Sequence, residues 1–116
     1  MTLSKALVIG SLCLVIIGLY PQKVWAESFK NKDFLDMPPV QQKFWLSGAI
    51  DTLGHVAVFK SKTQSQCVYD WYFLDTATQN GIILAAMKKY PDSTPSAIVI
   101  ILAERACGKF VRPNDE

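Results

Sequence analysis

Histidine and cysteine, the residues that most often build metal and redox sites, are rare in this chain. It has one histidine, His55, and three cysteines. A zinc site normally takes at least three protein ligands, and no His-x-Glu or Glu-x-x-His pattern is present to supply them. The sequence also lacks a Gly-x-Ser-x-Gly motif and a glycine-rich phosphate loop. We therefore predict a protein that is not an enzyme, and we predict no cofactor and no metal.

Charged residues are missing from the stretch Ala6 to Tyr20, which is apolar almost throughout. Lys5 precedes this stretch, a polar break follows it, and Val24-Trp25-Ala26 ends in a small residue before Glu27. This order is typical of a secretory signal peptide that is cleaved after residue 26. We therefore predict export to the periplasm, with secretion from the cell as the alternative.

Two alternatives are open for the amino end. A retained membrane anchor would need about 20 apolar residues, and the apolar stretch is shorter than that. A lipoprotein anchored through Cys13 is disfavoured because a lipidated cysteine normally follows a small residue, whereas Leu12 is large. After cleavage we expect no contact between the mature protein and a membrane.

A surplus of positive charge is also missing from the mature chain. Removing Lys5 and Lys23 with the signal peptide lowers the formal charge from +2 to zero, with ten basic and ten acidic residues from Glu27 to Glu116. Binding of phosphate backbones requires a concentration of lysine and arginine. We therefore expect no nucleic-acid partner.

Apolar periodicity and helix-start signals predict three helices. They run from about Pro39 to Phe59, from Asp75 or Thr76 to Tyr90, and from Pro95 to Cys107, with Gly108 as a left-handed stop. Gly48 and Gly54 interrupt the first helix, and we interpret them as sites of close helix packing. Lys60 to Gln66 is predicted to be a polar connector, and the terminal segments Glu27 to Lys32 and Val111 to Glu116 are predicted to fray.

Cys67 and Cys107 are the two cysteines that the mature chain would keep. An even number in an exported chain of this size favours a disulfide, and the short link between the second and third helices would pack them antiparallel and bring the two cysteines together. The predicted fold class is all-α: a small bundle of three to four helices with one disulfide. We expect a single domain of residues 27–116 with its core at about residues 36–110.

Asp51 and His55 lie one helical turn apart, so they share a helix face. They could in principle form an acid/base pair or half of a zinc site. Two ligands do not complete a metal site, so we interpret His55 as a solvated or locally hydrogen-bonded residue. Its titration near neutral pH leaves a pH-sensing role open.

The aromatic cluster after Cys67 is the strongest candidate for a recognition surface, because aromatic side chains dominate binding hot spots. The residues that we nominate for partner binding are Tyr69, Asp70, Trp71, Tyr72 and Asp75. Trp71 and Tyr72 are the expected anchors, and the two aspartates are the expected polar rim. The alternative is that most of these rings are buried in the core.

The order of features resembles a family of small periplasmic proteins. These features are a signal peptide, the aromatic-rich and glycine-containing helix Phe44-Trp45-Leu46-Ser47-Gly48-Ala49-Ile50-Asp51-Thr52-Leu53-Gly54, then Cys67, a helix ending at Tyr90-Pro91, and a last helix from Pro95 to Cys107. The chain is similar to the immunity proteins that neutralise peptidoglycan-amidase effectors of type VI secretion. Members of that family often have a second cysteine pair, which this chain lacks.

The resemblance implies a protein partner and inhibition by occlusion, in which the folded domain blocks the active-site cleft of a cell-wall-degrading effector. A weaker similarity to acid-stress chaperones of the HdeA type, which share the size, export and single bridge, implies the alternative of a periplasmic chaperone. The sequence leaves open whether the domain forms a homodimer.

Overall fold

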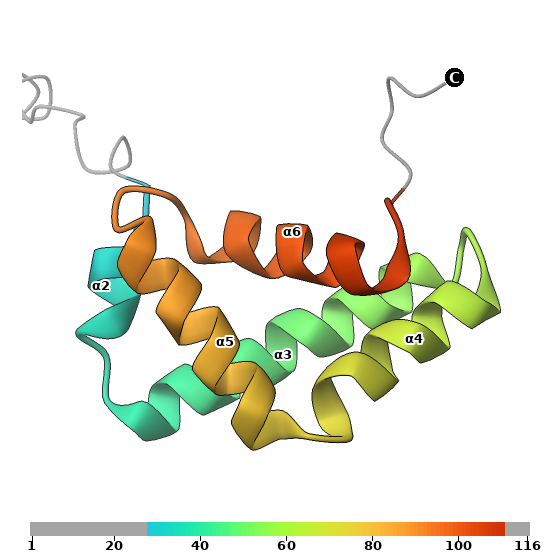
Figure 1. The fold of residues 1–116 in the computed structure, drawn as a ribbon, viewed down its shortest axis with the longest axis horizontal. Helices are drawn as coiled ribbons and strands as arrows, with labels where there is room; N and C mark the ends of the chain where they lie inside the picture. Colours follow the sequence, from blue (N-terminus) through green and yellow to red (C-terminus); the bar gives the residue numbers. More distant parts are fainter. Residues whose placement is uncertain (1–27, 111–116) are drawn as a thin grey trace, which may run out of the picture.

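The computed structural model describes residues 28–110, which form five α-helices and contain no strand (Figure 1). The helices are α2 (Asn31–Leu35), α3 (Pro39–Ala57), α4 (Lys62–Phe73), α5 (Thr76–Lys89) and α6 (Pro95–Cys107). The all-α class is confirmed, and the described part has two helices, α2 and α4, that were not predicted. The predicted signal peptide and the predicted frayed end Val111 to Glu116 lie outside the described residues.

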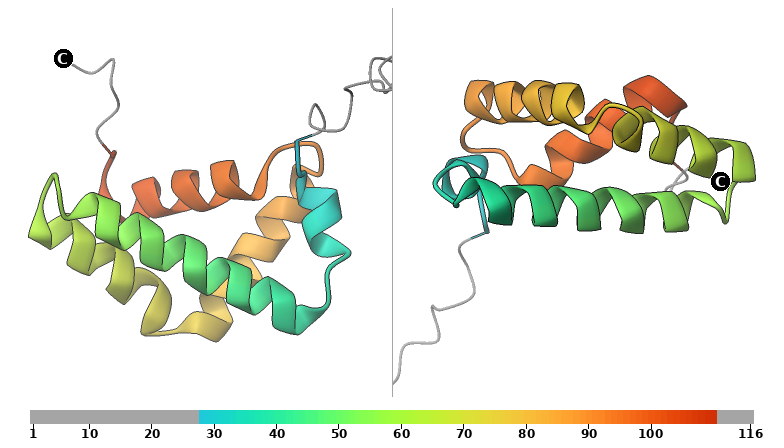
Figure 2. Two further views of the ribbon diagram at one scale, coloured as in Figure 1. Left: turned by 180° about the vertical axis from the view of Figure 1, so that it is seen from behind. Right: turned by 90° about the horizontal axis from the view of Figure 1, so that it is seen from below.

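The helices α3 and α4 form an antiparallel hairpin, and the other helices pack around it. In Figure 1, α6 crosses above the hairpin and α5 runs diagonally in front of it. The helix α6 contacts α4 and α5 and, less extensively, α3, whereas α2 packs against α5. This arrangement places one side of α3 on the core and leaves another side without a covering helix (Figure 2).

The core lies where all five helices meet. The buried hydrophobic side chains that pack together there are Phe34, Leu46, Ile50, Val68, Tyr72, Ile83, Met87, Ile98 and Val99. The rings of Phe34 and Trp45 meet edge to face at 5.2 Å between centroids, and this contact joins α2 to α3. Each helix therefore contributes to one continuous core.

The helix boundaries follow local chemistry. Pro39 and Pro95 begin α3 and α6, where a missing N–H costs nothing. The side chain of Thr94 accepts a hydrogen bond from the backbone N–H of Ala97, and Gly108 ends α6 at a φ of 87°, a conformation that favours glycine. The predicted starts of the first and third helices and the predicted stop at Gly108 are thus confirmed.

The prediction of a polar connector from Lys60 to Gln66 was wrong, because most of this segment belongs to α4. Ser61 caps the helix by accepting a hydrogen bond from the backbone N–H of Gln64 at 2.9 Å. The first turn then buries two polar residues, Gln64 and Ser65. The hydroxyl of Ser65 donates to the carbonyl oxygen of Gly54 at 2.8 Å, so this buried polar group is satisfied by α3.

The predicted fraying up to Lys32, and the core boundary at about residue 36, were also wrong. Asn31 is fully buried: its side-chain amide donates to the carbonyl oxygen of Tyr90, and its backbone N–H donates to that of Ser93. Phe34 is fully buried as well. The short helix α2 is therefore part of the core and is fixed to the loop between α5 and α6.

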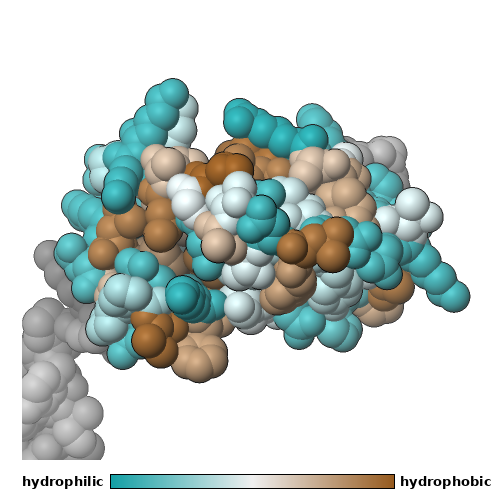
Figure 3. Space-filling view, turned by 60° about the horizontal axis from the view of Figure 1, so that its bottom comes forward, coloured by the Kyte–Doolittle hydropathy of each residue, from teal (hydrophilic) through white to brown (hydrophobic). Residues whose placement is uncertain are grey.

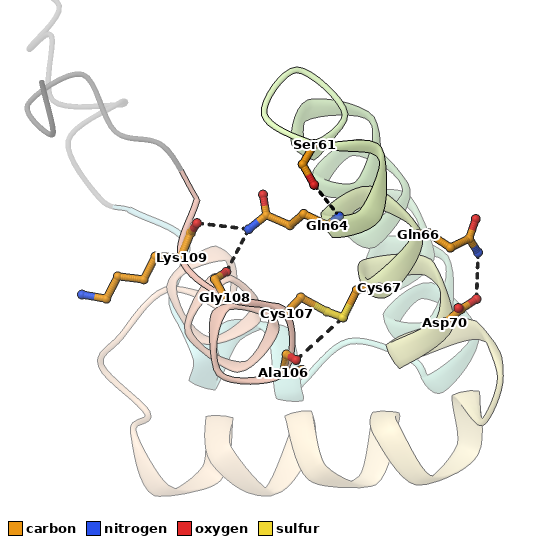
Figure 4. The surroundings of a disulfide bond; sticks show 9 residues. All are labelled: Ser61, Gln64, Gln66, Cys67, Asp70, Ala106, Cys107, Gly108 and Lys109. Carbon is orange, nitrogen blue, oxygen red and sulfur yellow. Dashed lines mark hydrogen bonds between the residues drawn. A yellow bond between two sulfur atoms is a disulfide. The ribbon is translucent and has the colours of Figure 1, made fainter.

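The predicted disulfide is confirmed, and it joins Cys67 to Cys107 with their Cα atoms 5.7 Å apart. In the predicted helix order, Cys67 lies just before the second helix. Cys67 lies instead in the middle of α4, so the bridge connects α4 to the last residue of α6. Figure 4 shows the two helices side by side at this point.

Candidate functional site

The five residues nominated for partner binding lie on α4 and at the turn that follows it. Successive residues of an α-helix are rotated by about 100°, so neighbours in sequence point to different sides. Tyr72 faces the core, Trp71 lies near the disulfide and Tyr69 lies against α3. The structure therefore does not bring the nominated residues together as one surface.

Tyr72 is 0% exposed, so the assignment of this residue as a surface anchor was wrong. Its hydroxyl donates a hydrogen bond of 2.6 Å to the side-chain oxygen of Asn80 on α5. The ring of Tyr72 meets that of Phe73 edge to face at 4.9 Å. Burial raises the pKa of the Tyr72 phenol above its ordinary value of 10.0, and hydrogen bonds to Ser47 and Asn80 partly oppose this rise.

Trp71 is half-buried and packs against the core rather than projecting from it. It lines a shallow hollow beside the disulfide together with Cys67 and Ala106. Because Trp71 and Tyr69 lie on opposite sides of α4, a partner that reached one would not at the same time cover the other.

The two nominated aspartates are exposed, and each also has a role within the chain. Asp70 accepts a hydrogen bond from the side-chain amide of Gln66 at 2.8 Å. Asp75 is the N-cap of α5 and accepts from the backbone N–H of Thr78 at 3.2 Å. A carboxylate at a helix N-terminus is stabilised there by the unpaired N–H groups and by the helix dipole.

An exposed apolar ridge lies between these aspartates, at the corner where α4 turns into α5. Phe73 is 44% exposed and Leu74 is 80% exposed, and the ring of Phe73 stacks on that of Tyr69 with 6.1 Å between centroids. We call Tyr69, Asp70, Phe73, Leu74 and Asp75 the α4–α5 corner. Figure 3 turns this side of the molecule forward and shows hydrophobic patches there, separated by hydrophilic residues.

The members of the corner that the site prediction left out are Phe73 and Leu74. Val68 and Tyr72 are four residues apart and mark the buried side of α4. This spacing is a sequence signal that places Phe73 and Leu74 outside the buried side. The signal was hidden because the first turn of α4 buries Gln64 and Ser65 instead of apolar residues.

Asp51 and His55 meet Tyr69 on the exposed side of the α3–α4 hairpin. The Tyr69 hydroxyl lies 2.7 Å from Nδ1 of His55 and 3.2 Å from both the backbone oxygen and Oδ1 of Asp51. The phenol has one proton, so a consistent arrangement has Nδ1–H of His55 donating to Tyr69 and the phenol donating to Asp51. The interpretation of His55 as a locally hydrogen-bonded residue is thus confirmed.

The pKa of Tyr69 is raised above 10.0, first by desolvation, then by its hydrogen bond to Asp51 and by the negative charge of that residue. The neutral phenol is therefore the form that the hairpin holds. In residues 28–110 no group of three or more His, Cys, Asp or Glu side chains could hold a metal ion. No helix in that range is both long and apolar enough to span a bilayer.

The carboxyl end of α6 is tied to the start of α4 beside the disulfide (Figure 4). The side-chain amide of Gln64 donates to the carbonyl oxygens of Gly108 and Lys109, each at 3.0 Å. The ammonium group of Lys60 also donates to Lys109, at 2.6 Å. Together with the disulfide, these bonds fix the position of α4, which carries most of the corner.

A second surface feature is an open apolar groove of about 610 Å³ between α3 and α6. In Figure 2 the two helices approach each other toward their carboxyl ends in the left view and move apart in the right view, so α6 crosses α3 at an angle. The groove is lined by Phe44, Trp45, Gly48, Ala49, Thr52, Leu53, Val56, Ser96, Val99 and Ile100. None of these side chains is charged, and none belongs to the α4–α5 corner.

Comparison of the chain with protein-family models, with curated proteins and with solved structures finds no match. The resemblance to immunity proteins of type VI secretion therefore stays a prediction.

Proposed function

We propose that the chain is exported to the periplasm, loses its signal peptide there, and acts as a non-enzymatic immunity protein. Its partner would be a cell-wall-degrading effector, for which a peptidoglycan amidase is the best candidate from the resemblance described above. The observation that carries the protein-binding part of this proposal is the α4–α5 corner. Covering this apolar ridge, in which Leu74 is 80% exposed beside the half-exposed Phe73, would remove adjacent apolar surface from water and so favour association with a partner.

The corner has the construction of a binding hot spot. The apolar side chains Phe73 and Leu74 form its centre, and the carboxylates of Asp70 and Asp75 border it. Interfaces commonly combine an apolar centre with a polar rim that fixes orientation. A corner between two helices is convex, so it is suited to enter the cleft of another protein, and a filled cleft excludes substrate.

The corner is also held rigidly before any partner binds. Tyr72 beneath it is fully buried and hydrogen-bonded to Asn80, and Asp75 caps the following helix. Ordering loops and side chains at an interface costs free energy, and a preformed surface avoids most of that cost. The disulfide supports the assignment to the periplasm, because such bridges persist in oxidising compartments.

The test is a pull-down with the chain expressed so that it can be exported, purified from periplasmic extract through a carboxyl-terminal tag, and offered to candidate amidase effectors at pH 7. We expect one tight partner whose hydrolysis of peptidoglycan is blocked. Leu74→Asp should abolish both capture and inhibition. Phe59→Asp is the matched control, because Phe59 is an apolar side chain of similar exposure, 90%, in the turn between α3 and α4.

Two results would contradict the proposal. If the Leu74→Asp variant still inhibited the effector fully, the α4–α5 corner would not be part of the interface. Many weak clients that bind only near pH 3, in place of one partner at pH 7, would identify the alternative, a chaperone of the HdeA type. The mass of the purified chain tests the export part separately, since cleavage after Ala26 leaves Glu27 as the first residue.

A further inference from the structure

A small cavity lies where the turn between α3 and α4 meets the carboxyl end of α6. Its volume is about 270 Å³, and its lining residues are Val56, Ala57, Phe59, Lys60, Gln64 and Phe110. We call it the Gln64 cavity. It shares only Val56 with the groove between α3 and α6, and it shares no residue with the α4–α5 corner. It is therefore distinct from both of the surfaces described above.

The side chain of Gln64 brings an acceptor without a hydrogen-bond partner to this cavity. Gln64 is only 7% exposed, and its amide nitrogen donates to Gly108 and Lys109. Its oxygen, Oε1, is buried and has no partner within the described part of the chain, and Figure 4 shows it pointing away from those two carbonyl groups. A buried acceptor without a donor costs free energy. A ligand whose donor reaches Oε1, with a slight shift of the cavity wall, removes that cost.

The walls of the cavity are mainly apolar, and two of them are aromatic. Phe59 is 90% exposed and forms the rim, whereas Phe110 is half-buried and packs against the core. An enclosed apolar cavity of about 150 Å³ holds a benzene molecule, so a cavity of about 270 Å³ has room for one or two fused rings. Aromatic rings that meet in such a cavity attract one another beyond the effect of their buried area.

Lys60 supplies the only charged group among the lining residues. Its ammonium group is held in place by the hydrogen bond of 2.6 Å to the carbonyl oxygen of Lys109. A cation beside the face of an aromatic ring is attracted to the ring, most strongly to an indole. A basic ligand would meet the like charge of Lys60, and an acidic ligand would bring its oxygens toward the acceptor of Gln64. A neutral ligand fits both groups.

We propose that the Gln64 cavity binds a small neutral aromatic molecule that carries one N–H or O–H donor. The ring lies between Phe59 and Phe110, and the donor bonds to Oε1 of Gln64. This arrangement uses the apolar walls, the ammonium group and the buried acceptor together. Small-molecule sites commonly have this construction, in which apolar walls provide affinity and a single polar group sets the orientation of the ligand.

The experiment is a titration of the exported, oxidised and isotopically labelled protein with indole, followed by NMR. We expect a dissociation constant of about 0.1–1 mM, which suits so small a ligand. The largest change in chemical shift should be at the side-chain amide of Gln64. Ring protons of indole should show nuclear Overhauser effects to Phe59 and Phe110.

Two probes test the chemistry of the site. Benzofuran has the shape of indole with an oxygen in place of the N–H, so it leaves Oε1 of Gln64 without a donor. It should bind at least about 10-fold more weakly than indole. Benzoate has an aromatic ring and a negative charge but no donor, and it should also bind more weakly than indole.

Substitutions locate the ligand. Phe59→Ala removes an almost fully exposed ring, so it should leave the fold intact and weaken indole binding about 3-fold or more. Phe110→Leu removes the other ring while keeping an apolar side chain, and it should weaken binding as well. Phe73→Ala, a matched change on the α4–α5 corner, should leave the dissociation constant for indole unchanged.

Three results would overturn the proposal: no shift at Gln64 with about 5 mM indole, which exceeds the expected dissociation constant, equal affinity for indole and benzofuran, or tighter binding of benzoate. Indole binding that requires removal of Val111 to Glu116 would assign the cavity to that segment and would overturn it too. Leu74→Asp should leave indole binding intact, and Phe59→Asp should leave effector inhibition intact. Failure of one proposal can therefore be distinguished from failure of the other.

Discussion

The phenol ring of Tyr69 covers Gly54 so closely that a Cβ at position 54 would lie 2.6 Å from Cζ of the ring. This contact sets the separation of α3 and α4. It also holds the Tyr69 hydroxyl beside His55 and Asp51. Gly54 is thus a glycine for reasons of packing, and the hydrogen-bonded cluster on the hairpin depends on it. A Cβ added at Gly48 would meet no atom within 4 Å, so the predicted close packing is confirmed for Gly54 and does not occur at Gly48 inside the described chain.

Gly54→Ala should destabilise the protein by about 1–3 kcal/mol, because the ring of Tyr69 must shift to admit the methyl group. Gly48→Ala is the matched control on the same helix, and it should stabilise the protein by about 1 kcal/mol through helix propensity alone. Urea denaturation followed by circular dichroism, at low micromolar concentration, measures both changes. Equal effects of the two substitutions would contradict the role given to Tyr69.

Removal of the disulfide by the double substitution Cys67→Ser and Cys107→Ser should lower the free energy of unfolding by about 4 kcal/mol. The bridge closes a loop of 40 residues, and the main effect in the chain-entropy account is to restrict the unfolded chain. Denaturation of the oxidised protein, the reduced protein and the double variant measures this change. An unaltered urea midpoint in the double variant would show that the hydrogen bonds of Gln64 and Lys60 suffice to hold the end of α6.

The parts of the fold that could be predicted from the sequence are those fixed by local chemistry. Pro39, Pro95 and Gly108 act within one turn of their own helix, so their meaning does not depend on distant residues. The disulfide could be predicted because a chain that lost Cys13 with the predicted signal peptide would keep two cysteines, which have only one way to pair.

The parts that escaped prediction depend on distant contacts. Asn31 is a polar residue near the predicted start of the mature chain, but it is buried because it finds hydrogen-bond partners in the loop after α5. The sequence around Gln64 and Ser65 resembles a linker, but both residues are buried because the Gln64 side-chain amide donates to Gly108 and Lys109 and the Ser65 hydroxyl donates to Gly54. The exposure of each ring near Tyr72 likewise depends on which helices surround α4, which composition does not reveal.

Phe34→Ala should cost about 3–5 kcal/mol of stability, the range for removing a buried aromatic ring. Phe34 is fully buried against Trp45, which makes α2 part of the cooperative unit. Phe59→Ala is the control, because Phe59 is almost fully exposed and its loss should change stability by no more than about 0.5 kcal/mol. Thermal and urea unfolding of both variants test this, and a small effect of Phe34→Ala would show that α2 is dispensable for folding.

The stability of the protein should fall as the pH rises above 10. Burial raises the pKa of Tyr72, and desolvation with its contact to Asp51 raises the pKa of Tyr69. A folded-state pKa above the unfolded value of 10.0 means that the folded protein holds the phenol proton more tightly. The stabilisation is therefore fully present below pH 10, and it is lost as the pH rises through the raised folded-state pKa values.

Alkaline titration of phenolate absorbance, combined with urea denaturation from pH 8 to 11, measures this effect. Tyr72→Phe removes one of the two ionisations, so the decline in unfolding free energy with pH should be shallower in that variant than in the unmodified protein. Tyr69→Phe removes the other and tests the hairpin cluster separately. If both variants kept the full pH slope, neither phenol would be the group that couples proton binding to folding.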